Sequence, residues 1–207
     1  MRSASKSLTY FSVICLLLVI VFYQQTPEIE NNFALHPHQI DYFYTAFTAV
    51  WLHANLEHLF GNLISLISLT AIFLLLFPNK WVSFFLKQYF LSSVLFFFIA
   101  KENTLHIGAS VWVYSFVTFI LTILLIQPNK KLLSIFFLTV LFFGSVWWGL
   151  LPIMPQVSYE GHLSGAITGI VIALISKREY LKILPQNYLP EWFKNEPQDE
   201  INPYDNL

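Results

Sequence analysis

Long runs of apolar residues, separated by short polar stretches, follow one another along this chain. Six runs approach the roughly 17–25 residues that a membrane-spanning helix needs. They cover residues 7–23, 58–77, 81–100, 107–126, 132–151 and 161–176. Transmembrane β-strands would instead alternate apolar and polar positions over about ten residues. The continuous runs therefore predict an all-α, polytopic membrane protein with a bundle of six spanning helices.

The composition agrees with this pattern. Of the 207 residues, 56% are hydrophobic and only 11% are charged, whereas an ordinary soluble domain carries about 25% charged residues. The mean hydropathy is +0.60, which favours lipid as the main solvent. Lys and Arg number 11 against 12 Asp and Glu, so there is no basic excess for binding nucleic acid. The single Cys cannot form an internal disulfide or a thiolate metal site.

The first apolar run follows Arg2 and Lys6, as a cleaved signal peptide would. However, Gln24, Gln25, Thr26 and Pro27 follow it, and they form no small-x-small cleavage pattern. The run is therefore predicted to remain as the first span, with cleavage as the alternative.

The basic residues predict the orientation, because Lys and Arg favour cytosolic loops. With the N-terminus in the cytosol, Lys101 is the outer basic residue. The inner ones are Arg2, Lys6, Lys80, Lys87, Lys130, Lys131, Lys177, Arg178, Lys182 and Lys194. Both termini are then cytosolic. Residues 1–183 are predicted to form one membrane domain, and residues 184–207, rich in Pro, Asn, Glu and Asp, a flexible cytosolic tail.

The first outer connection, residues 24–57, is unusually apolar and aromatic. It contains Phe33, Ala34, Leu35, Ile40, Tyr42, Phe43, Tyr44, Phe47 and Trp51. A fully solvated loop has no use for such side chains, so the segment is predicted to lie in the membrane interface.

Polar side chains gather near the outer starts of three spans. His58 and Asn62 begin the second span, Ser110 the fourth and His162 the sixth. Such groups are costly inside a membrane and are therefore candidates for function. The topology predicts that three separate parts of the chain bring them to one depth, just below the outer surface.

Helical spacing places several of these residues on common faces. His58 and Asn62 are four residues apart, as are Ser110 and Tyr114, so each pair shares a face. His162 is followed by Gly165 and Gly169, and this small-residue face lets a neighbouring helix approach closely. Gly108 precedes Ser110 at the opening of its helix, where free N–H groups favour an anion.

These residue types fit amide hydrolysis, which needs a nucleophile, a base and donors for the developing oxyanion. Ser110 can serve as the nucleophile and His162 as its base. His58, Asn62 and the Ser110 N–H can serve as the oxyanion donors. Glu57 and Glu160 are poorly placed as a third member, so the pattern favours a Ser–His dyad with Tyr114 packed on the imidazole.

Three other interpretations compete with hydrolysis by a dyad. Each polar residue alone is explained by bonds within or between helices. A metal site would use His53, His58, His106 and His162, but His53 and His58 are five residues apart and no carboxylate joins them at useful spacing. A transporter or channel would place charges along a pathway across the bilayer, whereas these polar groups stop near one face.

Three ordered motifs resemble those of the rhomboid intramembrane serine proteases. Residues 53–62 read HANLEHLFGN and resemble the family's HxxxxHxxxN element. Residues 108–114 read GASVWVY and resemble its GxSxxxY nucleophile turn. Residues 161–165, with Gly169 after them, resemble its HxxGxxxG sixth span. The resemblance covers about residues 7–178, and three motifs in order are more specific than any one.

The resemblance implies a six-helix rhomboid-like bundle and a role for each candidate residue. Ser110 would be the nucleophile, His162 the general base that Tyr114 stacks on, and His53 a structural residue that steadies the first connection. His58, Asn62 and the Ser110 N–H would line the oxyanion hole. Residues 24–45 would form a half-embedded outer hairpin.

The resemblance also implies a substrate class and a location. Substrates would be single-span membrane proteins with helix-destabilising residues near the cut, and no cofactor or metal is implied. The location would be the bacterial inner membrane. An inactive rhomboid-like protein that binds membrane clients is the alternative.

The chain departs from the family at two places. Val111 stands where rhomboids usually have Gly after the nucleophile. Tyr44 and Thr45 stand where many carry a Trp-Arg pair.

Overall fold

The computed structural model describes residues 2–127, 130–153 and 157–184. Within them, six longer helices correspond to the six predicted apolar runs. These are α1 (Arg2–Gln24), α4 (Leu56–Leu76), α5 (Trp81–Ile99), α6 (Ser110–Ile126), α7 (Lys130–Phe143) and α8 (Tyr159–Ile175). The described residues contain no strand beyond one isolated antiparallel bridge, between Leu35 and His106. The prediction of an all-α fold is confirmed.

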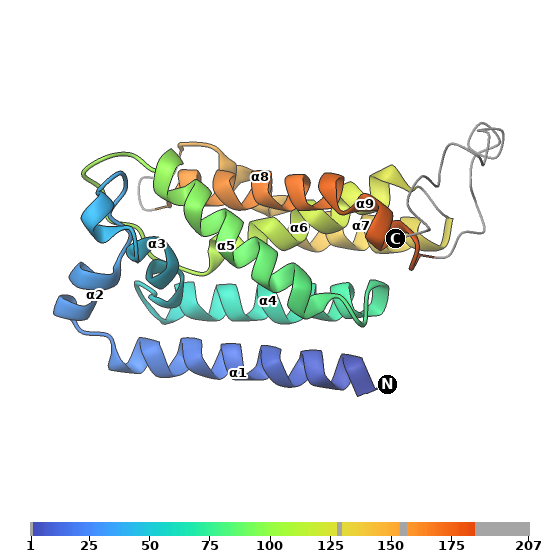
Figure 1. Ribbon diagram of the computed structural model, residues 1–207, viewed down its shortest axis with the longest axis horizontal. Helices are drawn as coiled ribbons and strands as arrows, with labels where there is room; N and C mark the ends of the chain where they lie inside the picture. The colour runs from blue at the N-terminus through green and yellow to red at the C-terminus, as the bar shows by residue number, and fades with distance from the viewer. Residues whose placement is uncertain (1, 128–129, 154–156, 185–207) are drawn as a thin grey trace, which may run out of the picture.

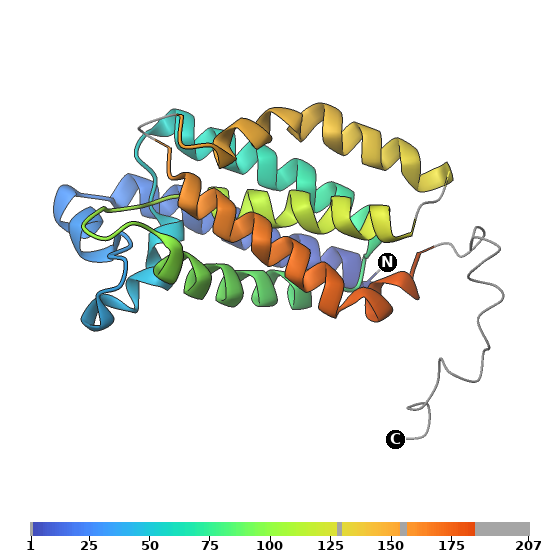
Figure 2. The ribbon, with the colours of Figure 1, turned by 90° about the horizontal axis from the view of Figure 1, so that it is seen from above.

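Helices α1 and α4 run along the long axis of the molecule and α5 crosses it obliquely, with the short helices α2 and α3 at one end and α9 at the other (Figure 1). Figure 2 shows α6 in the middle, between α7 on one side and α5 and α8 on the other. Every side chain from residue 111 to residue 121 is buried. A helix that is apolar all round is a core helix, so the helix that begins at Ser110 is the most enclosed element of the bundle.

Helices α6 and α8 pack closely because two glycines of α8 face the backbone of α6. A Cβ on Gly165 would overlap the Val111 carbonyl, and one on Gly169 would overlap the Ser115 carbonyl. Thr118 Oγ1 also donates a hydrogen bond of 2.9 Å to the Ala166 carbonyl. This small-residue contact fixes the start of α8 beside the start of α6.

Three helices are long and apolar enough to cross a membrane, by their length and composition. They are Ser5–Gln24, Leu56–Leu76 and Trp81–Ile99. The α6 and α8 helices have 17 residues each, which corresponds to about 25 Å at about 1.5 Å per residue. The apolar core of a bilayer is about 30 Å thick. The count of six spans therefore remains a prediction.

Two of the predicted spans differ from the structure in their detail. The run 107–126 becomes helical only at Ser110, because Gly108 has φ +120°, which no helix contains. The run 132–151 is α-helical only to Phe143, and a 3₁₀ segment, η3 (Gly144–Leu150), follows. Glycine disfavours the α-helix, and η3 begins at Gly144 and also contains Gly149.

The first outer connection is compact. It contains α2 (Pro27–Phe33), α3 (Thr45–Thr48) and two 3₁₀ turns, η1 (Ile40–Tyr42) and η2 (Ala49–Trp51). Thr45 Oγ1 donates to the Tyr42 carbonyl at 2.6 Å and accepts the His36 N–H at 3.1 Å. Tyr44 OH donates to the Asn32 carbonyl at 3.0 Å.

Tyr44 and Thr45, the residues that replace the expected Trp-Arg pair, thus close the connection through their own hydrogen bonds. Ile40 and Tyr44 remain exposed on it, at 72% and 45%. Its placement in the membrane interface stays a prediction.

A small ionic cluster holds the opposite end of the bundle. Glu179, in α9 (Lys177–Leu181), lies 2.7 Å from Lys80 and 3.4 Å from Lys87. The hydrogen bond from Lys80 is the main reason that the pKa of Glu179 falls below its ordinary value. Tyr180 and Leu184 are buried in the core. Residues 185–207 of the predicted tail lie outside the described residues, so the tail also stays a prediction.

Candidate active site

The structure brings Ser110 and His162 together. Ser110 is the first residue of α6, and His162 lies in the first turn of α8. Ser110 Oγ and His162 Nε2 are 3.1 Å apart, which is a hydrogen-bonding distance between a hydroxyl and an imidazole. The two residues are 52 positions apart in sequence, and the glycine contact between the two helices brings them together.

The ring of Tyr114 covers one face of the imidazole. The two rings are stacked at 4.0 Å between centroids and 14° between planes. The Tyr114 hydroxyl donates to the Val146 carbonyl of η3 at 2.6 Å. The aromatic ring is therefore fixed at both ends, by its own helix and by this hydrogen bond.

The second nitrogen of His162 also has a partner. Nδ1 lies 2.8 Å from the carbonyl oxygen of Gly149, again in η3. Because a carbonyl can only accept, Nδ1 carries the hydrogen in the neutral ring. Nε2 is then the lone-pair nitrogen that faces Ser110, which is the tautomer that a general base requires.

Gly108 forms the entrance to the α6 helix and contacts His58. Its φ of +120° favours glycine, and a Cβ there would lie 2.7 Å from His58 Nε2. The His58 ring is half-buried and thus lies against the turn that leads into Ser110. Any side chain at position 108 would displace either the turn or this ring.

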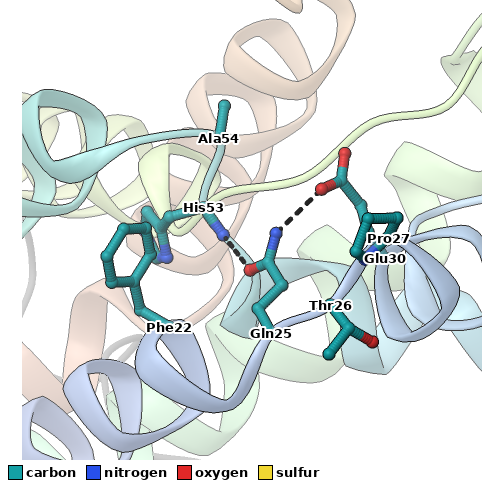
Figure 3. A pocket seen from close by; sticks show the side chains of 7 residues that line it. All are labelled: Phe22, Gln25, Thr26, Pro27, Glu30, His53 and Ala54. Carbon is teal, nitrogen blue, oxygen red and sulfur yellow. Dashed lines mark hydrogen bonds between the residues drawn. The ribbon is translucent and has the colours of Figure 1, made fainter.

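His53 joins the outer connection to the same turn. Its Nε2 accepts the Ala109 N–H at 3.4 Å, and its ring meets the His58 ring edge-on at 5.1 Å. The backbone N–H of His53 donates to Gln25 Oε1 at 3.1 Å, and Gln25 Nε2 donates to Glu30 Oε2 at 2.9 Å. Figure 3 shows both of these last contacts, beside a hollow of about 210 Å³.

The environment keeps His53 neutral. Burial of the ring is the main cause that lowers its pKa to about 4, with His58 adding to the effect and the Trp51 carbonyl opposing it. A neutral ring has one lone-pair nitrogen, which is what the Ala109 N–H requires.

In the described part of the chain, two hydrogen-bond donors, Asn62 Nδ2 and the Ser110 N–H, remain without an acceptor from their own surroundings or helix. Asn62 is only 6% exposed, and its Nδ2 has no acceptor within the described residues. A buried amide without a partner is costly, so it is a candidate for binding a ligand oxygen. The Ser110 N–H, at the start of its helix, has no acceptor inside that helix.

The histidines do not assemble a metal site in the described part of the chain, where no three His, Cys, Asp or Glu side chains are arranged to hold an ion. His106 is engaged elsewhere, since its Nε2 lies 2.7 Å from Thr104 Oγ1. Glu160 is buried and lies two residues before His162 in the sequence. It is not the hydrogen-bond partner of His162 Nδ1, because that partner is the Gly149 carbonyl.

Sequence reasoning did not identify the part played by η3. The acceptors for Tyr114 and His162 are backbone carbonyls, which every residue has, so no residue type marks them. The one available signal was Gly149 itself, a glycine inside an apolar run. Val146 and Gly149 are three residues apart, and in a 3₁₀ helix such positions lie on the same side.

Curated proteins of several mycobacteria resemble this chain in sequence. An uncharacterized protein of Mycobacterium bovis, Mb1372, is 28% identical over 177 residues, which are 81% of this chain and 73% of that protein. The uncharacterized protein Rv1337 of Mycobacterium tuberculosis matches to the same extent. The uncharacterized protein ML1171 of Mycobacterium leprae is 28% identical over 77% of this chain and 66% of its own length.

A family model matches most of the chain. The model of the Rhomboid domain covers residues 41–179, which include His53, the Ser110 turn and His162. The protein is therefore a polytopic helical membrane protein that belongs to the rhomboid family.

Proposed function

We propose that this protein is an intramembrane serine endopeptidase that cleaves single-span membrane proteins near the outer membrane face. The observation that carries the proposal is the 3.1 Å contact between Ser110 Oγ and His162 Nε2. The His162 tautomer, fixed by its Nδ1 contact, presents a lone pair to the hydroxyl. The pair has the geometry of a nucleophile and its general base.

The proposed reaction has two halves. The Ser110 Oγ attacks the substrate carbonyl carbon while His162 Nε2 takes the hydroxyl proton, and a tetrahedral oxyanion forms. The oxyanion collapses as the C–N bond breaks, and His162 returns the proton to the leaving amine. Water then attacks the acyl carbon on Ser110 while His162 Nε2 takes a proton from it. The acyl C–O bond breaks, His162 returns that proton to Ser110 Oγ, and the acid product leaves.

The oxyanion would be held by donors that have nothing else to bind. Asn62 Nδ2 lacks an acceptor in the described residues, and the Ser110 N–H lies at a helix start, where donors and the helix dipole favour negative charge. His58, packed against Gly108, would supply a third donor. Such preorganised donors stabilise charge that appears only in the transition state.

The substrate class follows from the chemistry of helices in lipid. A peptide in a stable helix keeps its carbonyls in hydrogen bonds, so a substrate must unwind before Ser110 can attack. Residues that disfavour helices near the cut make this unwinding easier. Single-span proteins with such residues are therefore the proposed substrates, in the bilayer itself.

The proposed orientation places both termini in the cytosol of a bacterial cell, in the inner membrane. It rests on the predicted topology, in which ten of the eleven Lys and Arg residues fall on the inner side. Reporter fusions test it. A reporter fused after Asn103 should give the outer signal and one after Asp205 the inner signal, and the reverse pair would overturn the orientation.

The alternative is an inactive rhomboid-like protein that binds membrane clients. It would be favoured if the branched side chain of Val111, directly after the nucleophile, crowded the substrate cleft. Val111 is 1% exposed and belongs to the main hydrophobic core. Its side chain packs inside the protein, which favours the enzyme over the inactive binder.

Labelling with a serine-reactive fluorophosphonate distinguishes the two functions. The Ser110 oxygen would bond to phosphorus as fluoride leaves. The purified wild type should label and should cleave a reconstituted single-span substrate, and Ser110→Ala should do neither. Ser115→Ala, a buried serine on the same helix, is the control and should behave as wild type. A folded wild type that neither labels nor cleaves would support the client-binding function.

A further inference from the structure

The 3₁₀ segment η3 contacts both rings of the candidate site through its backbone. The Val146 carbonyl accepts the Tyr114 hydroxyl at 2.6 Å, and the Gly149 carbonyl accepts His162 Nδ1 at 2.8 Å. The two carbonyls are three residues apart, which is one turn of a 3₁₀ helix, so they face the same side. An α-helix continued to residue 151 would rotate them apart by about 60°.

A Ser–His pair needs something at the second imidazole nitrogen. The partner there selects the tautomer, holds the ring plane and stabilises the imidazolium that forms during attack. Serine proteases commonly use a carboxylate for this purpose. In the described residues, the hydrogen-bond partner of His162 Nδ1 is a neutral backbone carbonyl.

The identity of residue 149 matters because of its size. A Cβ built on Gly149 would overlap the Tyr114 hydroxyl and would lie 2.7 Å from His162 Nδ1. A side chain there would therefore push η3 away from the rings and break both hydrogen bonds. A Cβ built on Gly144, at the start of the same segment, would have no heavy atom of the described residues within 4 Å apart from those of its own neighbours in the chain.

We propose that Gly149 is a positioning residue whose backbone carbonyl orients the His162 imidazole for its role as the base of Ser110. This inference rests on the proposed function. It assigns to η3, and not to an acidic side chain, the task of holding the base. The absence of a side chain at Gly149 is what lets the carbonyl reach the imidazole.

A backbone substitution tests the carbonyl directly. Replacing Leu150 by its α-hydroxy analogue turns the 149–150 amide into an ester, and an ester carbonyl is a weaker acceptor. A positioned general base contributes about 10²–10⁴-fold to a rate, so weakening its orientation should slow the maximal labelling rate of the fluorophosphonate by roughly tenfold. The probe concentration at half-maximal rate should change little, because the carbonyl contacts His162 and not the probe.

The adjacent residue provides the matched control. The same α-hydroxy replacement at Leu151 removes its N–H bond to the Trp148 carbonyl, at 3.2 Å, but leaves the Gly149 carbonyl as an amide. This control should label at the wild-type rate. Equal slowing by both esters, or no slowing by the first, would overturn the proposal.

A side-chain pair gives a second, independent readout. Gly149→Ala should lower the rate of substrate cleavage at saturation by at least about tenfold with little change in KM, since the general base is misplaced after binding. Gly144→Ala should leave both constants unchanged. Unfolding temperatures of both variants are measured beside the kinetics. A folded Gly149→Ala protein with wild-type turnover would overturn the proposal.

The design separates this inference from the proposed function. Wild-type protein that neither labels nor cleaves contradicts the protease itself. Wild-type protein that labels at Ser110, together with variants that label equally fast, contradicts only the role of Gly149.

Discussion

The free amide of Asn62 offers a sharp test of the oxyanion donors. Asn62→Ala removes a buried Nδ2 that has no acceptor in the described residues. Because the resting protein loses no hydrogen bond from this nitrogen, the change should cost little stability, and it relieves an unpartnered donor. The transition state, in contrast, would lose one of its proposed donors.

The expected size follows from how many donors remain. Removing one oxyanion donor from a soluble serine protease costs about 10²–10³ in turnover. Here the Ser110 N–H and His58 would still bind the oxyanion. We therefore expect the turnover of Asn62→Ala to fall by about 10- to 100-fold, which corresponds to about 1.4–2.7 kcal/mol of transition-state stabilisation. KM should stay nearly constant, because the donor acts on charge that the bound substrate lacks.

The assay is cleavage of a single-span substrate in proteoliposomes, with capture of the same substrate by Ser110→Ala and Ser110→Ala/Asn62→Ala protein measured beside it. Two control variants lie on the same helix. Ser68→Ala changes an exposed hydroxyl that bonds its own turn and should be silent. Thr70→Ala removes the acceptor of Trp81 Nε1, at 3.3 Å, and should lower stability but not turnover.

Asn62→Ala with unchanged turnover would refute the donor role. Equal losses of capture and turnover would show that Asn62 shapes the binding cleft and does not stabilise the transition state.

Three further predictions concern the dyad, the helix contact and the ionic cluster. Ser110→Ala and His162→Ala should each abolish cleavage, and the double variant should be no worse than either, because the two groups act as a unit; additive losses in a cleavage assay would contradict this. Gly169→Ala should lower the unfolding temperature, because its Cβ would overlap the Ser115 carbonyl and overpacking costs about 1–3 kcal/mol. Gly61→Ala, with open space around it, should raise that temperature or leave it unchanged, and a reversed order would be inconsistent with the α6–α8 contact. The lysine partners lower the pKa of Glu179 from its ordinary 4.5, so its stabilisation is present above that pH and is lost as the pH falls through the lower, folded-state value. Glu179→Gln should therefore be less stable than wild type at neutral pH and should approach it in acid, measured by unfolding temperature against pH, whereas a constant difference would exclude this linkage.

The sequence determined the helical elements because each apolar run satisfies its own backbone hydrogen bonds by becoming a helix in lipid. It also determined which faces could meet. The spacing of Gly165 and Gly169 behind His162 predicted the close contact with a neighbouring helix, and that contact is seen with α6. The order of the motifs led to the rhomboid family, which the match over residues 41–179 confirms.

Local pattern failed where backbone geometry changes without a change in polarity. Residues 144–150 contain no charged residue and continue the apolar run, so hydropathy alone predicted one span over 132–151. The 3₁₀ conformation of η3 and the positive φ of Gly108 depend on what packs against each segment. Both alter where backbone groups point, and neither changes the hydrophobic pattern.

The sequence therefore identified the reactive side chains. Only the tertiary structure decided which backbone groups are their hydrogen-bond partners. Ser110, His162 and Tyr114 carry distinctive chemistry at fixed spacings, so they could be identified before any fold was known. The carbonyls of Val146 and Gly149, the Ala109 N–H held by His53, and the unpartnered amide of Asn62 are defined by distance and burial. These quantities arise when helices far apart in sequence pack together, because every residue carries the same backbone groups and packing alone selects which of them meet.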